Sequence, residues 1–145
     1  MIFMKDKAFL DTNILVYAFD TADPRKQEIS QELLIAGLEH EQHMISVQVL
    51  GEFFNVVTRP RVTENPMSSE DARKAISMFN LLPVQEIDLN MVHRAIDTHI
   101  MYQISYWDAL IISAAERGGC ASILSEDLNN SQEYHGIVVI NPFAV

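Results

Sequence analysis

The amino-acid sequence predicts a three-layer α/β/α sandwich with a short, mostly parallel central sheet, formed by a single domain over residues 1–145. Short and nearly continuous apolar stretches recur along the chain, and segments with the apolar spacing of amphipathic helices separate them. This alternation is typical of βαβ units, whose parallel strands are buried on both faces. The length of 145 residues also suits one domain with its own core.

The elements of the first half follow from apolar runs and from residues that start or stop helices. An apolar run into Asp11 predicts the first strand, and a shorter run into Ser46 predicts the second. Two helices lie between them, and Pro24 suits the first turn of the longer one. Ser46 can cap a further helix, which Pro60 ends. The expected bounds before this last helix are 7–10, 13–19, about 24–39 and 44–46.

The second half begins with a predicted loop over residues 59–66. Ser68 and Asp71 have the spacing of a capping box and predict the start of a helix. Ser105 starts the last predicted helix, which ends at the glycine pair that follows Arg117. The remaining expected elements are a helix over about 69–82, a strand over 84–87, a helix over about 90–103, and strands over 121–124 and 137–140.

Composition limits the classes of function. Ten Lys and Arg against twenty Asp and Glu give a net charge of −10, which disfavours nucleic-acid binding by nonspecific phosphate neutralisation. The single Cys120 cannot form an intrachain disulfide and is expected to be a small buried residue in a cytoplasmic protein. No apolar run approaches the roughly 20 residues of a membrane span, and the first residues do not resemble a signal peptide.

Four acidic residues are predicted to meet at the carboxyl edge of the sheet. Asp11 and Asp127 follow predicted strands, and ligands gather beyond such strand ends in open parallel sheets. Asp108 lies near the start of the helix that precedes the Asp127 strand, and Glu52 lies in the second turn of the helix after the second strand. Right-handed crossovers bring these helix starts to the same edge.

Each acid alone also has a structural explanation. Asp11 can cap a helix, Asp108 has a capping-box position, and Asp127 suits a turn. Glu52 shares a polar helix face with Gln48, and such faces are usually solvated. The function therefore has to be argued from the four acids as a group.

A group of four carboxylates attracts a divalent cation. Two like charges about 4 Å apart cost about 1 kcal/mol in water and about 4 kcal/mol at an effective dielectric constant of about 20. Oxygen ligands without His or Cys suit Mg²⁺ or Mn²⁺. Such an ion can activate a bound water and stabilise a departing oxygen, so hydrolysis of a phosphodiester is the natural reaction.

Four stretches of the chain carry a family resemblance. They read LDTNILVY, SVQVLGEFFNVVTR, SYWDALI and LSEDL, in this order within residues 9–128. Together they resemble the PIN-domain family, specifically its VapC-type toxin ribonucleases. The resemblance implies a PIN-like fold and a metal-dependent endoribonuclease that cleaves RNA. It also implies a small basic or amphipathic antitoxin as partner, and a homodimer.

The resemblance also implies roles for individual residues. The most direct ligands of Mg²⁺ or Mn²⁺ would be Asp11 and Asp108, while Glu52 and Asp127 would act directly or through water. The supporting polar positions of the family match Thr12, Asn13 and Ser125. The family often has a glycine soon after the last acid, and Asn-Asn-Ser at residues 129–131 departs from that pattern.

Other residues invite a functional interpretation with less support. Arg59 and Arg61 are candidate RNA phosphate contacts, although a solvated helix end explains them equally well. Tyr106 and Trp107 have the chemistry for base stacking but are expected in the core. The i, i+3 histidines at 40 and 43 are expected at a solvated helix end rather than at a metal.

Two other functions stay open. One is a noncatalytic PIN-like scaffold that binds a partner or RNA. The other is a phosphohydrolase of the haloacid-dehalogenase type with Asp11 as the nucleophile. That chemistry would require a second aspartate where the chain has Asn13, so the sequence disfavours it.

Overall fold

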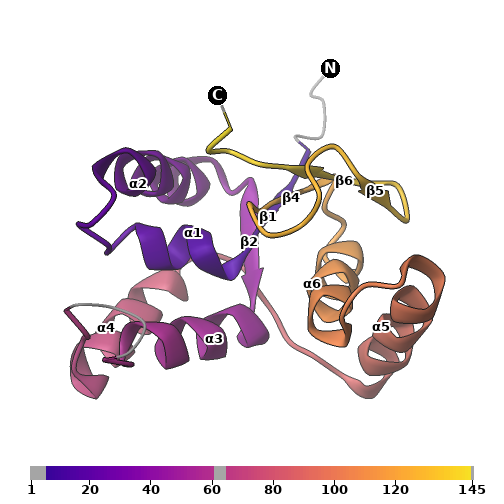
Figure 1. Cartoon of the computed structure of the whole chain (residues 1–145), viewed down its shortest axis with the longest axis horizontal. Helices are drawn as coiled ribbons and strands as arrows, with labels where there is room; N and C mark the ends of the chain where they lie inside the picture. The colour runs from indigo at the N-terminus through magenta and orange to yellow at the C-terminus, as the bar shows by residue number, and fades with distance from the viewer. Residues whose placement is uncertain (1–5, 61–64, 145) are drawn as a thin grey trace.

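The computed structural model describes residues 6–60 and 65–144, in which helices and strands alternate (Figure 1). The strands are β1 (Ala8–Leu10), β2 (His43–Ser46), β3 (Val84–Gln85), β4 (Ser122–Leu124), β5 (Glu133–Tyr134) and β6 (Ile137–Ile140). The helices are α1 (Thr12–Tyr17), α2 (Pro24–His40), α3 (Val47–Val57), α4 (Ser69–Phe79), α5 (Leu89–Tyr102) and α6 (Tyr106–Arg117).

The six strands form one sheet in the order β3-β2-β1-β4-β6-β5. All neighbouring strands are parallel except β5, which is antiparallel to β6. In the middle of the sheet Phe9 pairs with Met44 on one side and with Ile123 on the other. The short, mostly parallel sheet that the apolar runs predict is therefore confirmed.

Helices cover both faces of this sheet. In Figure 1, α1 to α4 lie on one side of the strands, and α5 and α6 lie on the other. Helix α1 contacts α2 and α3, α3 contacts α4, and α5 packs against α6. Right-handed connections explain this division, because the chain reverses its direction across the sheet after β3. The three-layer α/β/α arrangement is confirmed.

The core fixes the orientation of the elements that approach the carboxyl edge. Phe9, Ile45 and Ile123 on the central strands have no exposed surface. Phe53 of α3 is equally buried, and its ring packs edge-to-face on Phe79 of α4 with 5.0 Å between the centroids. Burial of this face of α3 turns the polar face of the helix toward the carboxyl edge of the sheet.

A few elements differ from the sequence prediction. Strand β5 was not expected, because its two residues show no apolar run; a turn through Gly136, at a φ of 83°, joins it to β6. Helix α4 ends at Phe79 rather than near residue 82, and β3 stops at Gln85 rather than at 87. Within the described ranges, no helix combines the length and the apolar character that a membrane crossing requires.

Candidate active site

A cavity of about 330 Å³ lies beyond the carboxyl ends of β1, β2 and β4. All four acids that the sequence singles out contribute to its walls. The carboxylates of the lining are Asp11, Glu52, Asp108 and Asp127. The other lining residues are Thr12, Asn13, Gln48, Asn55, Val56, Trp107 and Ile111.

Asp11 is the most enclosed of the four acids, with 9% of its surface exposed. It directly follows β1 and caps α1, so its Oδ1 accepts a hydrogen bond from the Thr12 backbone N–H at 2.7 Å. Ser125 Oγ donates to its Oδ2, also at 2.7 Å. Burial raises the pKa of Asp11 to about 6; these two hydrogen bonds oppose the rise, and the charges of Asp127 and Glu52 add to it.

Glu52 projects from α3 and is held by two polar neighbours. The Thr12 hydroxyl donates to Glu52 Oε1 at 2.6 Å, and Gln48 Nε2 donates to Oε2 at 3.3 Å. Gln48 lies one helical turn before Glu52, so both side chains share a face of α3. The sequence suggests that this polar face is solvated, but the structure places it along the cavity.

Asp127 sits in the loop after β4 and is fixed from both sides. Asn13 Nδ2 donates to its Oδ2 at 2.7 Å, and its own backbone N–H donates to Ser125 Oγ at 3.1 Å. Burial is the main cause that raises the pKa of Asp127, and the carboxylates of Glu126, Asp108 and Glu52 add to the rise. For both Asp11 and Asp127, burial is thus the largest cause of the raised pKa, and neighbouring carboxylates add to it.

A cluster beside the cavity anchors the loop that carries Asp127. Lys26 Nζ of α2 lies 2.8 Å from Glu126 Oε2, and the Tyr17 hydroxyl donates to the other oxygen of that carboxylate. The Lys26 ammonium also lies 4.8 Å from the centre of the Tyr17 ring. No sequence motif marks this cluster, because its members come from three separate segments.

Asp108 lies in the first turn of α6, where its backbone N–H donates to Ser105 Oγ at 3.1 Å. Ser105 therefore caps α6 as predicted, and the Asp108 side chain lines the cavity. The Asp11 carboxylate itself both caps α1 and lines the cavity.

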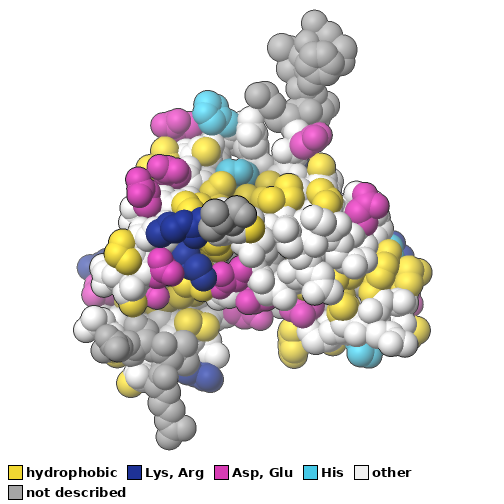
Figure 2. Space-filling view, turned by 45° about the horizontal axis from the view of Figure 1, so that its top comes forward, with side chains coloured by type: hydrophobic (Ala, Val, Ile, Leu, Met, Phe, Trp, Pro, Cys, Tyr) yellow, Lys and Arg dark blue, Asp and Glu magenta, His cyan; other side chains and the backbone are white. Residues whose placement is uncertain are grey.

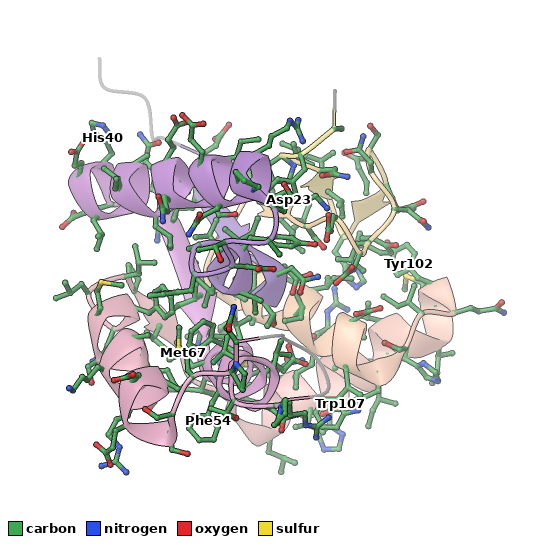
Figure 3. The ribbon with its side chains drawn as sticks, turned by 60° about the vertical axis from the view of Figure 1, so that its left-hand side comes forward. Asp23, His40, Phe54, Met67, Tyr102 and Trp107 are labelled. Carbon is green, nitrogen blue, oxygen red and sulfur yellow. The ribbon has the colours of Figure 1, made fainter. Side chains whose placement is uncertain are left out.

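Trp107 corrects an expectation. The apolar spacing around it predicts a core position, yet 61% of its surface is exposed and it lines the cavity. Residues 109–115 of α6 are all buried, whereas the three residues before them in the first turn are not. Tyr106 packs against the core as expected. Figure 3 labels Trp107 at the margin of the molecule, on the same side as Phe54 of α3.

The remaining candidates lie elsewhere. Arg59 is exposed just beyond the end of α3 and does not line the cavity, and Arg61 falls outside the described residues. His43 is buried, with 2.8 Å between its Nδ1 and the Leu33 carbonyl oxygen. His40, in contrast, is exposed at the end of α2. Cys120 is buried, and burial raises the pKa of its thiol to about 11.

The donor set fits a hard divalent cation. The cavity lining has four carboxylates and no His or Cys. In residues 6–60 and 65–144, however, no three or more His, Cys, Asp or Glu side chains lie together in an arrangement that could already hold a metal ion. Three of the four acids instead accept hydrogen bonds from neutral side chains: Glu52 from Thr12, Asp127 from Asn13, and Asp11 from Ser125.

Most of the chain matches one known protein family. The family model for the PIN domain matches residues 8–132. No curated protein sequence gives a match.

Several solved structures share the fold. The sarcin–ricin loop cleaving toxin VapC20 of Mycobacterium tuberculosis aligns with a TM-score of 0.63 and 16% identity, over 81% of this chain and 87% of that one. A toxin–antitoxin complex from Klebsiella pneumoniae aligns with a TM-score of 0.63 and 18% identity, over 96% of this chain and 100% of that one. FitAcB from Neisseria gonorrhoeae aligns with a TM-score of 0.65 and 15% identity, over 95% of this chain and 99% of that one. At such identities the likeness concerns the fold.

Proposed function

Because this chain belongs to the PIN-domain family, we propose that it is a metal-dependent endoribonuclease that hydrolyses RNA phosphodiester bonds and acts as the toxin of a toxin–antitoxin pair. The observation that carries the proposal is that four carboxylates from four separate segments line one cavity. Each carboxylate alone has a structural explanation, but capping and turn formation do not require all four to line the same cavity.

The chain's own residues would hold Mg²⁺ or Mn²⁺ in this cavity. Asp11 and Asp108 are the proposed direct ligands, and Glu52 and Asp127 bind directly or through water. When bound, such an ion supplies a water of lowered pKa and neutralises charge on the departing oxygen. Hydrogen bonds from Thr12 and Asn13 set the orientation of the carboxylates before any ligand arrives.

The wall of the cavity also explains why a cation is needed for the substrate. Among the described residues, its lining contains no Lys or Arg. A phosphate that enters would therefore meet only carboxylates and neutral groups, and it would be repelled. A divalent ion between the carboxylates and the phosphate removes this repulsion, so metal binding and substrate binding are expected to depend on each other.

The proposed protein partner is a small antitoxin with basic or amphipathic character. The Klebsiella relative in fold is itself a toxin–antitoxin complex, and a chain with net charge −10 suits a cationic inhibitor. An apolar cavity of about 390 Å³ between α2 and α4 offers the same partner a place for apolar side chains. Its walls include Phe19, Leu34, Ile35, Leu38 and Met78. A homodimer and a cytoplasmic location are part of this proposal.

The test is cleavage of RNA by purified variants in the presence of Mn²⁺. We expect Asp11→Asn and Asp108→Asn to abolish cleavage and to leave the circular dichroism spectrum unchanged. Asn13→Ala should lower the rate by roughly 10- to 100-fold, as the loss of groups that orient ligands does. Asp97→Asn, an exposed helix position outside the cavity, is the matched control. Undiminished cleavage by Asp11→Asn in a preparation free of other nucleases would refute the proposal.

Calorimetry separates the alternatives. A folded protein that does not bind Mn²⁺ would favour the noncatalytic scaffold. A phosphohydrolase with Asp11 as nucleophile would form a covalent phosphoenzyme, which mass spectrometry detects as an added phosphoryl group on Asp11. That alternative is weakened by Asn13, which occupies the position of the second acid and donates to Asp127.

A further inference from the structure

We propose that Trp107 is a stacking platform for an unpaired nucleobase of the RNA strand whose phosphate enters the acidic cavity. The inference rests on the proposed nuclease function and adds a contact to the substrate that does not depend on charge. It also names the substrate class more closely, because a base is free to stack on a protein ring only where the RNA is single-stranded.

The exposure of Trp107 is unusual for its place in the fold. It belongs to α6, and residues 109–115 of that helix are all buried. Its side chain is 61% exposed, although indole is the largest aromatic group and normally buries most of its surface. Its neighbour in the chain, Asp108, is one of the four acids of the cavity, and both residues line that cavity. The indole therefore stands beside the proposed reaction site.

The local structure holds this indole in place. The Tyr106 ring packs against it with 5.0 Å between the centroids and 75° between the planes. Gln48 Nε2 donates to the Trp107 carbonyl oxygen at 3.1 Å and to Glu52 Oε2 at 3.3 Å. One amide group thus ties the backbone of the platform to a carboxylate of the cavity. A ring that is already oriented loses little conformational freedom when a base stacks on it.

The negative charge of the molecule explains why a stacking contact would help it to bind RNA. Most nucleic-acid binding rests on Lys and Arg that neutralise phosphates, but this chain carries a net charge of −10. The described lining of the cavity has no basic residue. Base stacking on an aromatic ring does not depend on charge and works for every base. Stacking is therefore the contact by which an acidic surface of this kind can hold an RNA strand.

The experiment uses the intrinsic fluorescence of the protein, because Trp107 is the only tryptophan in the chain. The protein with its four acids intact is titrated with a nonhydrolysable single-stranded RNA analogue of about 8 nucleotides in the presence of Mn²⁺. We expect the RNA to quench the fluorescence of Trp107, and a duplex of the same length to leave it unchanged. Quenching by the duplex alone would contradict the proposal.

Variants then test the energetics. Trp107→Ala should weaken binding of the single-stranded RNA by roughly tenfold or more, and should raise KM more than it lowers kcat in the cleavage-competent protein. Trp107→Phe keeps an aromatic face and should restore most of the affinity. Leu81→Ala, at an apolar side chain that is 72% exposed outside the cavity lining, is the control for loss of exposed apolar surface. Equal affinity and KM in Trp107→Ala and the parent protein would overturn the inference.

The outcomes also distinguish this inference from the proposed function. RNA that quenches Trp107 but is never cleaved supports the platform and refutes the nuclease. Cleavage with an unchanged KM in Trp107→Ala supports the nuclease and refutes the platform. A fluorescence change that follows protein dilution instead of RNA addition would assign Trp107 to a contact between two copies of the chain, and would overturn the inference as well.

Discussion

Asp11 is subject to two opposing effects. Burial raises its pKa, while hydrogen bonds from the Thr12 backbone and the Ser125 hydroxyl lower it, and burial prevails at a pKa of about 6. The hydrogen bonds keep the carboxylate in one orientation at the cost of leaving a buried negative charge at neutral pH. A residue in this condition is destabilising for the fold until it gains a positively charged neighbour.

The stability of the metal-free protein should depend on the ionisation of Asp11. Its pKa is higher in the folded state, at about 6, than the ordinary 3.8, so the folded chain binds the proton more tightly. The stabilising contribution is then complete below pH 3.8 and is lost as the pH rises through about 6. The difference between these two pKa values corresponds to a change of about 3 kcal/mol in the free energy of unfolding.

Urea unfolding in the presence of a chelator, at several pH values, measures this effect. Asp11→Asn removes the ionisation and keeps an acceptor for the Thr12 N–H, so it should be more stable than the parent at about pH 8 and lose this advantage toward about pH 4. Asp97→Asn should follow the parent at every pH. A parent and an Asp11→Asn protein with parallel pH profiles would show that burial of Asp11 carries no such cost.

Single residues also show where sequence reasoning stops. The positions of Asp11 and Asp127 follow from the rule that ligand-binding residues come after parallel strands, and the structure places both at that edge. The exposure of Trp107 does not follow, because it depends on which neighbours cover the first turn of α6, and apolar spacing does not supply that. The link from Gln48 to Glu52 and to the Trp107 carbonyl depends on side-chain orientation, which no spacing rule supplies.

Among the elements, helix starts were more predictable than helix ends. Ser46, Ser68 and Ser105 each accept a hydrogen bond from the backbone N–H three residues later, as predicted. A start is marked by a side chain that can cap it, whereas an end without glycine or proline leaves little signal. Helix α4 is the example, because it ends before the predicted residue. Helices α2 and α5 end close to the predicted residues, with Glu41 and Gln103 in the left-handed conformation at φ values of 55° and 56°.

These left-handed ends predict a stabilising substitution. Glycine adopts a positive φ without steric cost, so Gln103→Gly should stabilise the protein by up to about 1 kcal/mol. Asn80→Gly is the matched control, because Asn80 ends α4 with a φ of −66°. There glycine only adds freedom to the unfolded chain, and a loss of stability is expected. Thermal unfolding compares the two variants, and a Gln103→Gly protein less stable than Asn80→Gly would contradict this account.

For the whole molecule, charge is the dominant constraint. Figure 2 shows acidic side chains spread over the visible face, while Lys and Arg side chains form one group and otherwise lie scattered at the margins. Several cations are already paired: Lys26 with Glu126, Arg94 with Glu116, and Arg117 with Asp88. Few positive charges therefore remain to contact a nucleic acid, and long-range attraction will not bring RNA to the cavity.

The salt dependence of RNA binding measures this constraint. At constant Mn²⁺, the affinity of the parent protein for a nonhydrolysable single-stranded RNA should fall by less than about tenfold between about 50 and 200 mM salt, as expected for one or two neutralised phosphates. Asn55→Lys, which places a cation in the cavity wall, should steepen the dependence. A decrease of about a thousandfold in the parent would mean that many phosphate contacts operate.

The two margins of the sheet set how the protein can assemble with others. Strands β3 and β5, which form these margins, have only two residues each. Partners that bind by adding a strand need a row of free main-chain donors and acceptors, and margins this short supply very little of it. Partners are therefore expected to bind to the helices and loops. The short edge strands also protect the sheet against edge-to-edge strand pairing between molecules, the contact that builds fibrils.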